Sequence, residues 1–339
     1  MGVTIHDVAK KAGVSIATVS RVVNGVHAGS LDIRQRVLNA AEELGYVSRS
    51  SLRRGRLGDA MRFVMQPLIP LGSYYGDILQ GAEEEARAHH YDLYFSMAHH
   101  SMGVLEPHSE SKGFTEGAIA GVIYAGDPPP ELYERIQEAS IPLIIVNAYL
   151  PGQQADSVMC DNFRSAHRAV QYLLQLGHRR IACIGYQSRV PSTEERIYGV
   201  RLALQEAGIP FEQGMVRAKG TDVDGGYEAM NVLLALPEPP TAVFGVTDEI
   251  ALGAMKYTKE AGLGVPEEIS FVGVNDLDMA QHAEPPLTTV HIPRREMGRI
   301  AVRRLLELIQ YPDTPRTRTD VLYTFVERAS CARAPEERT

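Results

Sequence analysis

At 339 residues the chain is too long for one ordinary domain, and its 44% hydrophobic and 22% charged residues are typical of globular proteins. The net charge of −8 and the lack of any apolar stretch as long as a membrane span exclude a uniformly basic protein and a membrane-spanning one. Because the first residues lack the apolar run of a signal peptide and the three cysteines lack metal or redox spacing, we expect a cytoplasmic protein.

Two short helices joined by one glycine are predicted at the start of the chain, in VTIHDVAKKAGVSIATVSRVVNG (3–25). Thr4 is suited to cap the first helix. Gly13 can adopt the left-handed backbone of a tight turn between helices. Ser15 then caps a second helix, with Thr18 three residues later. Helix, short turn and helix is the pattern of a helix-turn-helix.

A third helix is predicted between the Ser30 cap and Gly45, and the three helices together can bury one small core. The segment VSRSSLRRGRLGD (47–59) is rich in Ser, Arg and Gly, which is typical of a linker. Residues 1–58 carry nine basic and four acidic side chains, whereas the rest of the chain carries 25 basic and 38 acidic ones. A basic head on an acidic body indicates that the head binds a polyanion.

From about residue 60, strands alternate with amphipathic helices. The predicted buried strands are 62–65, 91–98, 120–126, 142–148, 180–186, 242–248 and 269–276. This alternation implies right-handed crossovers and parallel sheets covered on both faces. Because about 270 residues exceed what one sheet usually holds, we predict two doubly wound lobes, an α/β fold. Ligands of such sheets bind beyond the carboxyl ends of the strands, so a cleft between the lobes is the expected site.

Motifs of common enzyme sites are missing from the sequence. It contains no Gly-x-Gly-x-x-Gly after a strand, no phosphate loop, no Gly-x-Ser-x-Gly elbow and no His-Glu-x-x-His. Histidines cluster at 89–90 and 99–100, but nothing in their spacing makes them converge on a metal ion. We therefore predict a protein that is not an enzyme, with no catalytic residue, no metal and no cofactor.

The segment 3–25 resembles the DNA-binding head of the lactose-repressor (LacI/GalR) family of bacterial transcription regulators. Further segments resemble parts of the same family in family order: IRQRVLNAAEELGY, YYGDILQGAEEEARAHHYDL, DNFRSAHRAVQYLLQLGHRRIACIG, ERIYGVRLALQEAGI, TDEIALGAMKYTKEAGLGVPEEISFVGVNDLD and PPLTTVHIPRREMGRIAVRRLLELI. The resemblance implies a helix-turn-helix head on a two-lobed core like that of periplasmic binding proteins. It also implies that the chain crosses between the lobes three times.

The resemblance divides the chain into a DNA-binding head (1–46), a hinge or linker (47–59) and a core for effector binding and dimerisation (60–339). Within the core, lobe one is expected at about 60–155 and 288–316, and lobe two at about 156–287 and 317–332. The implied function is a ligand-responsive repressor that binds a near-palindromic operator as a homodimer. The tetramer-forming tail of some relatives is not expected, because the C-terminus has no leucine heptads.

The implied effector is a small polar metabolite. A sugar is favoured because the family uses sugars most often, and a purine or nucleoside is the alternative. A solute-binding protein would share the two-lobed core, but it would need the export signal that the sequence lacks. A nucleotide-using enzyme would need a phosphate-binding loop.

By resemblance, one set of residues is expected to contact double-stranded DNA. In the major groove, Arg21 can pair with a guanine edge, while Ile16 and Ala17 can only make apolar contacts such as with thymine methyls. Leu52 is a candidate wedge in the minor groove. The full set is Thr4, Ser15, Ile16, Ala17, Thr18, Ser20, Arg21, Asn24, Leu52 and Arg53. The alternatives are that Ile16 belongs to the head core and that Leu52 packs on the effector domain, since the linker is about three residues shorter than usual and lacks the usual Pro-Asn pair.

A second set is expected, again by resemblance, to bind the effector. Tyrosine faces suit stacking on a sugar or base, and Arg, Asn and Asp supply donors and acceptors for hydroxyl groups. The set is Tyr74, Tyr75, Asp127, Asn147, Arg196, Thr247, Asp248 and Asn275. Thr247 and Asn275 stand where the family usually has Asn and Asp. The alternatives are that Asp248 only caps the helix that follows and that Tyr75 is a core residue.

Overall fold

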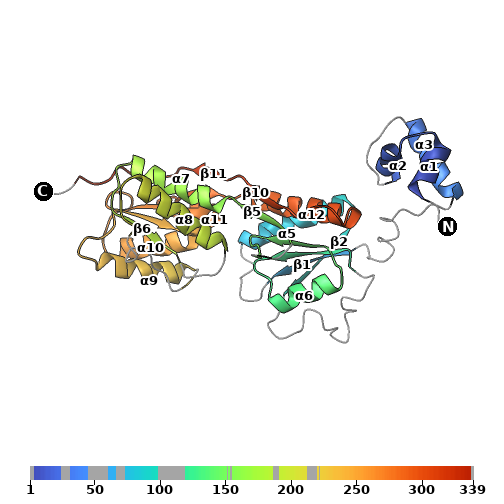
Figure 1. The fold of residues 1–339 in the computed structure, drawn as a ribbon. Coiled ribbons are helices and arrows are strands. Elements are labelled where there is room, and N and C mark those ends of the chain that lie inside the picture. The colour runs from blue at the N-terminus through green and yellow to red at the C-terminus, as the bar shows by residue number, and fades with distance from the viewer. Residues whose placement is uncertain are drawn as a thin grey trace.

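The computed structural model describes residues 4–23, 31–44, 60–65, 73–97, 119–150, 152, 155–185, 191–211, 220 and 222–336. A head of three helices precedes two α/β lobes, each built on its own sheet (Figure 1). The predicted fold class is therefore confirmed.

The head consists of α1 (Ile5–Ala12), α2 (Ile16–Val23) and α3 (Leu31–Leu44). Gly13 ends α1 with a φ of 66°, the left-handed conformation that the turn requires. The three helices share one small apolar cluster, to which each contributes a completely buried valine: Val8, Val19 and Val37. The predicted helix-turn-helix with its own core is present.

The first lobe is a six-stranded sheet with the order β10-β5-β4-β3-β1-β2, and all its strand pairs are parallel. Its strands are β1 (Ala60–Met65), β2 (Asp92–Met97), β3 (Gly121–Ala125), β4 (Leu143–Val146), β5 (Asp156–Cys160) and β10 (Arg318–Val321). One face packs against α5 (Ser73–Ala88) and α12 (Arg294–Gln310), and the other against α6 (Pro130–Glu138) (Figure 1). Because both faces are covered, β3 and β4 are buried at every residue.

Two glycines explain how closely α5 and α12 pack. A Cβ at Gly81 would lie 1.8 Å from the carbonyl oxygen of Arg295, and one at Gly298 would lie 2.0 Å from that of Ile78. Only glycine permits this approach of two backbones. On the solvent side, Arg295 and Arg299 both pair with Glu84, so a polar layer covers the same contact.

The second lobe is a five-stranded sheet with the order β11-β9-β8-β7-β6, in which only the β9–β11 pair is antiparallel. Its strands are β6 (Ile181–Ile184), β7 (Ala242–Gly245), β8 (Ser270–Asn275), β9 (Thr288–His291) and β11 (Thr324–Val326). Its helices are α7 (Asn162–Gln175), α8 (Pro191–Glu206), α9 (Val223–Leu234), α10 (Asp248–Glu260) and the short α11 (Asp278–Gln281). Helices α7 and α8 pack against each other, as do α9 and α10.

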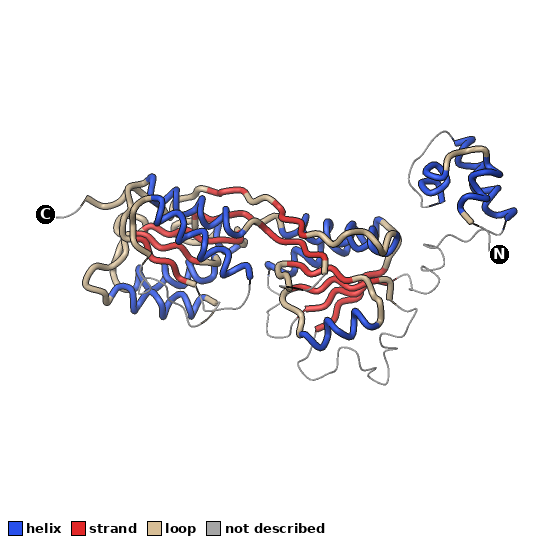
Figure 2. The backbone as a smooth tube through the Cα atoms, viewed as in Figure 1, coloured by secondary structure: helices blue, strands red, loops and turns tan. Residues whose placement is uncertain are grey.

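The chain crosses between the lobes three times, as predicted, and Figure 2 shows the crossings running along one side of the molecule. They follow β5, β9 and β10, so each crossing lies one strand later than the sequence indicated. Strand β5 pairs with β4 in the first sheet, and β9 pairs with β8 in the second. These strands have only four or five residues, and the lobe to which each belongs is decided by the strands with which its backbone pairs.

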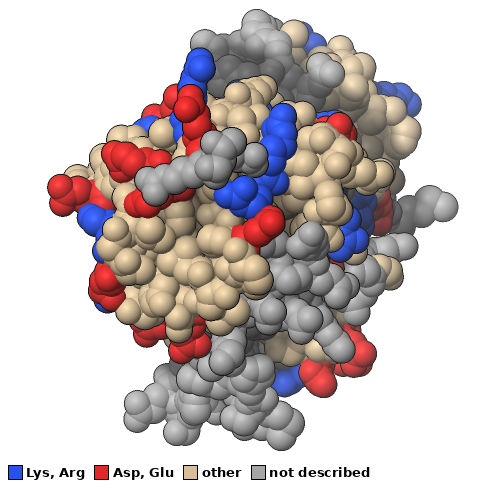
Figure 3. All heavy atoms as spheres, turned by 90° about the vertical axis from the view of Figure 1, so that its left-hand side faces the viewer, with Lys and Arg blue, Asp and Glu red and all other residues tan. Residues whose placement is uncertain are grey.

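Figure 3 views the molecule from the end of the second lobe. Acidic and basic side chains lie around a largely uncharged area of this face. Across the described parts of the chain, no helix is both long and apolar enough to cross a membrane.

Candidate functional site

The exposed side of α2 is the first candidate site. Ile16 is 42% exposed and Ala17 is also exposed, whereas Val19 and Val22 on the other side are buried. The alternative that Ile16 belongs to the head core is therefore wrong. Arg21 lies in the last part of α2, four residues after Ala17 and so on the same side of the helix; its side chain is outside the described atoms.

Hydroxyl groups hold the starts of both exposed helices. The backbone N–H and the Oγ1 of Thr4 donate to one carboxylate oxygen of Asp7, at 2.8 and 2.7 Å, and these bonds lower the pKa of Asp7. The Oγ of Ser15 accepts from the backbone N–H of Thr18 at 3.1 Å, and the two hydroxyls lie 2.8 Å apart. Helix starts of this kind attract phosphate groups.

The remaining DNA-binding predictions have little structural description. Ser20 is partly buried on α2. Asn24, Leu52 and Arg53 lie outside the described residues, and so does the whole linker 47–59.

The first lobe brings three predicted effector residues together at the carboxyl end of β4. Asn147 follows this strand with a φ of 63°, and its amide faces the start of α5. Tyr74 donates its hydroxyl to Oδ1 of Asn147 at 2.9 Å, and Nδ2 of Asn147 donates to the Tyr75 hydroxyl at 3.0 Å. The two rings pack edge to face with centroids 5.0 Å apart. Burial raises the pKa of Tyr74, so its hydroxyl stays a neutral donor.

In the second lobe, Arg196 lies in the first turns of α8, the helix that follows β6. It is only 4% exposed, yet no carboxylate among the described residues pairs with it directly. Its Nε donates to Oδ1 of Asn162 at 2.9 Å, and its Nη1 donates to the carbonyl of Val246 after β7.

Asp248 has a structural role. It is fully buried; Oδ2 accepts from the backbone N–H of Leu277 at 2.7 Å, and Oδ1 accepts from the Thr289 hydroxyl. Burial raises its pKa to about 6. Thr247 caps α10, because its side chain accepts from the N–H of Ile250 at 3.3 Å. With both carboxylate oxygens bound to donors of its own lobe, Asp248 ties α10 to the strands beside it.

Asn275 ends β8 with a φ of 119° and is 5% exposed. Its Oδ1 is buried and has no hydrogen-bond partner among the described residues. An unpaired buried acceptor is costly unless a ligand or water supplies a donor. Asp127, after β3, is exposed on one side, while partial burial on the other raises its pKa above the usual value.

Two protein families match this chain, one in the head and one in the core. Residues 4–48 match the family described as bacterial regulatory proteins, lacI family, and residues 170–331 match a periplasmic binding protein-like domain. The transcriptional repressor CytR of Escherichia coli K12 is 33% identical over 314 residues, covering 91% of this chain and 90% of CytR. The chain belongs to the LacI family. It is accordingly a transcriptional repressor with a DNA-binding head and a ligand-binding core.

Other LacI-family proteins extend the likeness over the full length. The repressor PurR of Vibrio atlanticus is 30% identical, covering 96% of this chain and 98% of PurR. The solved complex of the transcriptional regulator CelR with cellobiose aligns with a TM-score of 0.72 at 29% identity, covering 97% and 99% of the two chains. The lac repressor dimer bound to operator shares the fold, with a TM-score of 0.68 at 24% identity and coverage of 98% and 100%.

In this LacI-family core, two polar residues that the sequence did not single out join the predicted ones. Asn162 is completely buried and bonds to Arg196. Arg294, at the start of α12, donates to Asp77 at 2.7 and 2.9 Å and to the carbonyl of Asn275, and its guanidinium lies 5.8 Å from the Tyr74 ring centroid. The sequence offered only a weak signal for Arg294, a basic pair after a proline at a helix start.

Two cavities in the second lobe lie away from the predicted effector residues. One of about 340 Å³ runs along the outer side of α10, and one of about 440 Å³ lies beside the start of β6, near Arg180 and Phe211. None of the eight predicted effector residues lines either cavity. The predicted effector residues lie at the carboxyl ends of the parallel strands, where ligands of such sheets bind, and not in these cavities.

The raised pKa of Asp248 predicts a pH dependence of stability. Between about pH 4 and pH 6 the folded protein keeps the proton on Asp248 while the unfolded chain has lost it, so this group's contribution to the free energy of unfolding falls as pH rises. In Asp248→Asn the amide oxygen can accept from the Leu277 N–H and the amide nitrogen can donate to a turned Thr289 hydroxyl, so the variant should remove that loss, about 1–3 kcal/mol. Urea unfolding of both proteins from pH 4 to 7 measures it. A constant difference between parent and variant over this range would show that Asp248 ionises normally.

Proposed function

We propose that this LacI-family repressor binds a near-palindromic operator as a homodimer and releases or tightens its hold when a small polar effector, a sugar, binds between the lobes. One observation carries the proposal: Arg294 of the first lobe donates to the carbonyl of Asn275 in the second lobe and lies 5.8 Å from the ring centroid of Tyr74, which bonds to Asn147. Donors and acceptors of both kinds in one place suit a molecule with several hydroxyl groups.

The operator would be read by the exposed side of α2. Ile16 and Ala17 are free to make apolar contacts in the major groove, and the hydroxyl-capped starts of α1 and α2 suit phosphate contacts. Phosphate contacts fix the position of the head, and base contacts from Arg21 would supply specificity.

Replacing Arg21 by alanine should relax the preference at one base pair in each half-site by about 1–3 kcal/mol, because a bidentate pair with guanine is lost. Lys10→Ala, a change at an exposed position of α1, is the control and should leave base preferences unchanged. Operator selection from a random library measures both. If Arg21→Ala selects the same operators as the parent, Arg21 does not read a base.

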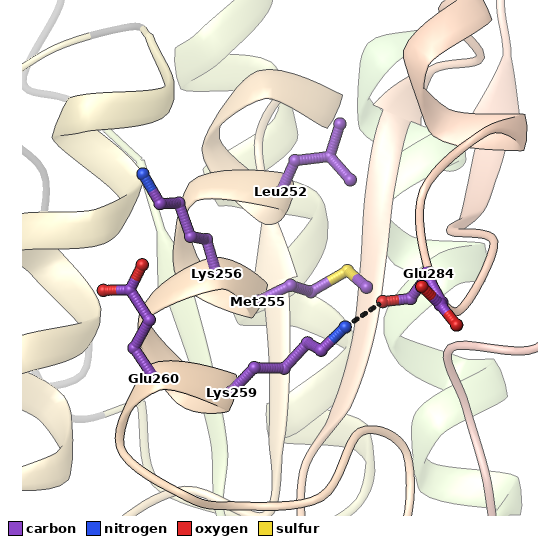
Figure 4. A pocket seen from close by; sticks show the side chains of 6 residues that line it. All are labelled: Leu252, Met255, Lys256, Lys259, Glu260 and Glu284. Carbon is purple, nitrogen blue, oxygen red and sulfur yellow. Dashed lines mark hydrogen bonds between the residues drawn. The ribbon is translucent and has the colours of Figure 1, made fainter.

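A second copy of the chain is the partner expected at two exposed surfaces. Strand β2 is an edge of the first sheet, and it exposes 55% of Tyr94 and 41% of Phe95. In the second lobe, the groove on α10 places the half-buried Leu252 beside lysines and glutamates, with the buried Met255 beneath, and Lys259 donates to the carbonyl of Glu284 at 2.9 Å (Figure 4). Apolar groups flanked by both signs of charge suit a self-complementary two-fold contact.

Phe95→Glu should therefore weaken the dimer and, with it, operator binding, because a charge on an edge strand opposes pairing with another copy. Tyr198→Glu is a matched control, since Tyr198 is 56% exposed on α8. Sedimentation equilibrium gives the dimer dissociation constant of each protein. A dimer that is equally stable in both variants would place the contact elsewhere.

Arg196→Ala tests the effector site. It should cost about 1.5–3 kcal/mol of effector binding, because a charge-assisted donor is lost, while operator binding without effector is retained. Arg201→Ala, on an exposed position of the same helix, is the control. Operator release is followed by fluorescence anisotropy with panels of sugars, including ribose and cellobiose, and of nucleosides. Equal responses of parent and Arg196→Ala would remove Arg196 from the site, and a response to nucleosides alone would replace the sugar by the second candidate.

A further inference from the structure

One ionic contact joins the two lobes beside the third crossing. Arg318 lies on β10, in the sheet of the first lobe, and its Nη2 donates to Oε1 of Glu195 on α8 of the second lobe at 2.8 Å. The guanidinium also lies over the ring of Tyr149, 4.7 Å from its centroid. The Glu195 side chain is 17% exposed and that of Arg318 is 36% exposed, so the pair is partly shielded from water.

The same glutamate leads into the proposed effector site. Oε2 of Glu195 accepts from Nδ2 of Asn162 at 3.2 Å, and Oδ1 of Asn162 accepts from Nε of Arg196 at 2.9 Å. Asn162 is completely buried, so the orientation of its amide is set by its bonds to other residues and not by water. Its Nδ2 bonds in addition to the carbonyl of Cys160 at the end of β5.

We propose that Arg318 and Glu195 are positioning residues that couple the arrangement of the lobes to the orientation of Arg196. Movement of β10 relative to α8 breaks the Arg318–Glu195 contact, which frees Glu195 to shift and turns the Asn162 amide that holds the Arg196 guanidinium. In the reverse direction, an effector that pulls on Arg196 changes the contact at the crossing. This inference rests on the proposed role of Arg196 in effector binding.

The contact can open at a moderate cost. Nε of Arg318 donates to Asp320 on its own strand at 2.9 Å, so the guanidinium keeps a carboxylate when it leaves Glu195. The Glu195 carboxylate then keeps the neutral amide of Asn162 as its partner, and because its side chain is 17% exposed, water can reach it. Breaking an ion pair is strongly unfavourable when it leaves a fully buried charge alone, and neither charge of this pair is fully buried. Two arrangements of similar free energy are what a ligand-controlled switch requires.

The first test measures the arrangement of the lobes without effector. Spin labels on Glu138→Cys in α6 and Gln205→Cys in α8, both at exposed positions, report the distance between the lobes by pulsed electron resonance in the full-length protein. Arg318→Gln and Glu195→Gln should each broaden or shift the distance distribution, and the double variant should do no more than either alone. Arg318→Lys should restore most of the parent distribution. Asp320→Asn, which removes the carboxylate that Arg318 keeps when it leaves Glu195, should instead narrow the distribution toward the arrangement in which Arg318 contacts Glu195.

The second test follows Arg196 itself. The Nε–H of a buried, hydrogen-bonded arginine gives a resolved nitrogen–proton NMR signal, which Arg196→Lys identifies by its loss. This signal should shift in Arg318→Gln and Glu195→Gln but not in Asp320→Asn. Unchanged distances, additive effects in the double variant, or an unmoved Arg196 signal would each overturn the coupling. Both measurements are made without effector or operator, so their failure is separate from a failure of the proposed function, which the effector panel tests.

Discussion

The burial of the Arg196 guanidinium is the constraint on which the proposed effector site depends. A buried charge is tolerated only when its donors are well bonded, and here the acceptors are the amide of Asn162 and the carbonyl of Val246. These two bonds fix the start of α8 relative to the start of α7 and the end of β7. Three connections of the second lobe are thereby held at one place, and the guanidinium holds a defined orientation before any ligand binds.

The contacts that stabilise each lobe differ from those that join the two lobes. Each sheet packs against helices through completely buried aliphatic and aromatic side chains, such as Phe63 in the first lobe and Phe271 in the second. Because this packing is close, each lobe is rigid. Polar contacts also join the lobes, as at Arg318 with Glu195 and at Arg294 with the Asn275 carbonyl. A partly exposed ion pair contributes about 1 kcal/mol or less, and allosteric coupling is typically about 1–3 kcal/mol. A ligand can therefore shift the lobes without disturbing either core.

In the head, too, the residues that stabilise the fold are separate from the exposed residues of the proposed binding site. Its core of small side chains, mostly valine and alanine, stabilises three short helices. The exposed side of α2 contributes to this stability through the Ser15 cap. Residues such as Ile16 and Ala17 can consequently differ between family members without loss of the fold. The buried side of α2 thus stabilises the head, and its exposed side is left for the DNA contacts that we propose.

The sequence by itself determined the features that depend on neighbouring residues. Caps at Thr4 and Ser15, the turn at Gly13 and the alternation of apolar strands with amphipathic helices are local patterns, and all are present in the structure. The short strands β5, β9 and β10 were assigned to the wrong lobe, and the roles of Asn162 and Arg294 were not foreseen.

These points depend on contacts between distant parts of the chain, and so do the partners of Asp248, since Leu277 and Thr289 lie 29 and 41 residues away. The alternative that Asp248 caps α10 is wrong, because Thr247 is the cap. Arg318 meets Glu195 across 123 residues of sequence. A local pattern specifies which face of an element is buried, but it does not specify which distant backbone or side chain will meet that face. That choice is made when the two sheets assemble.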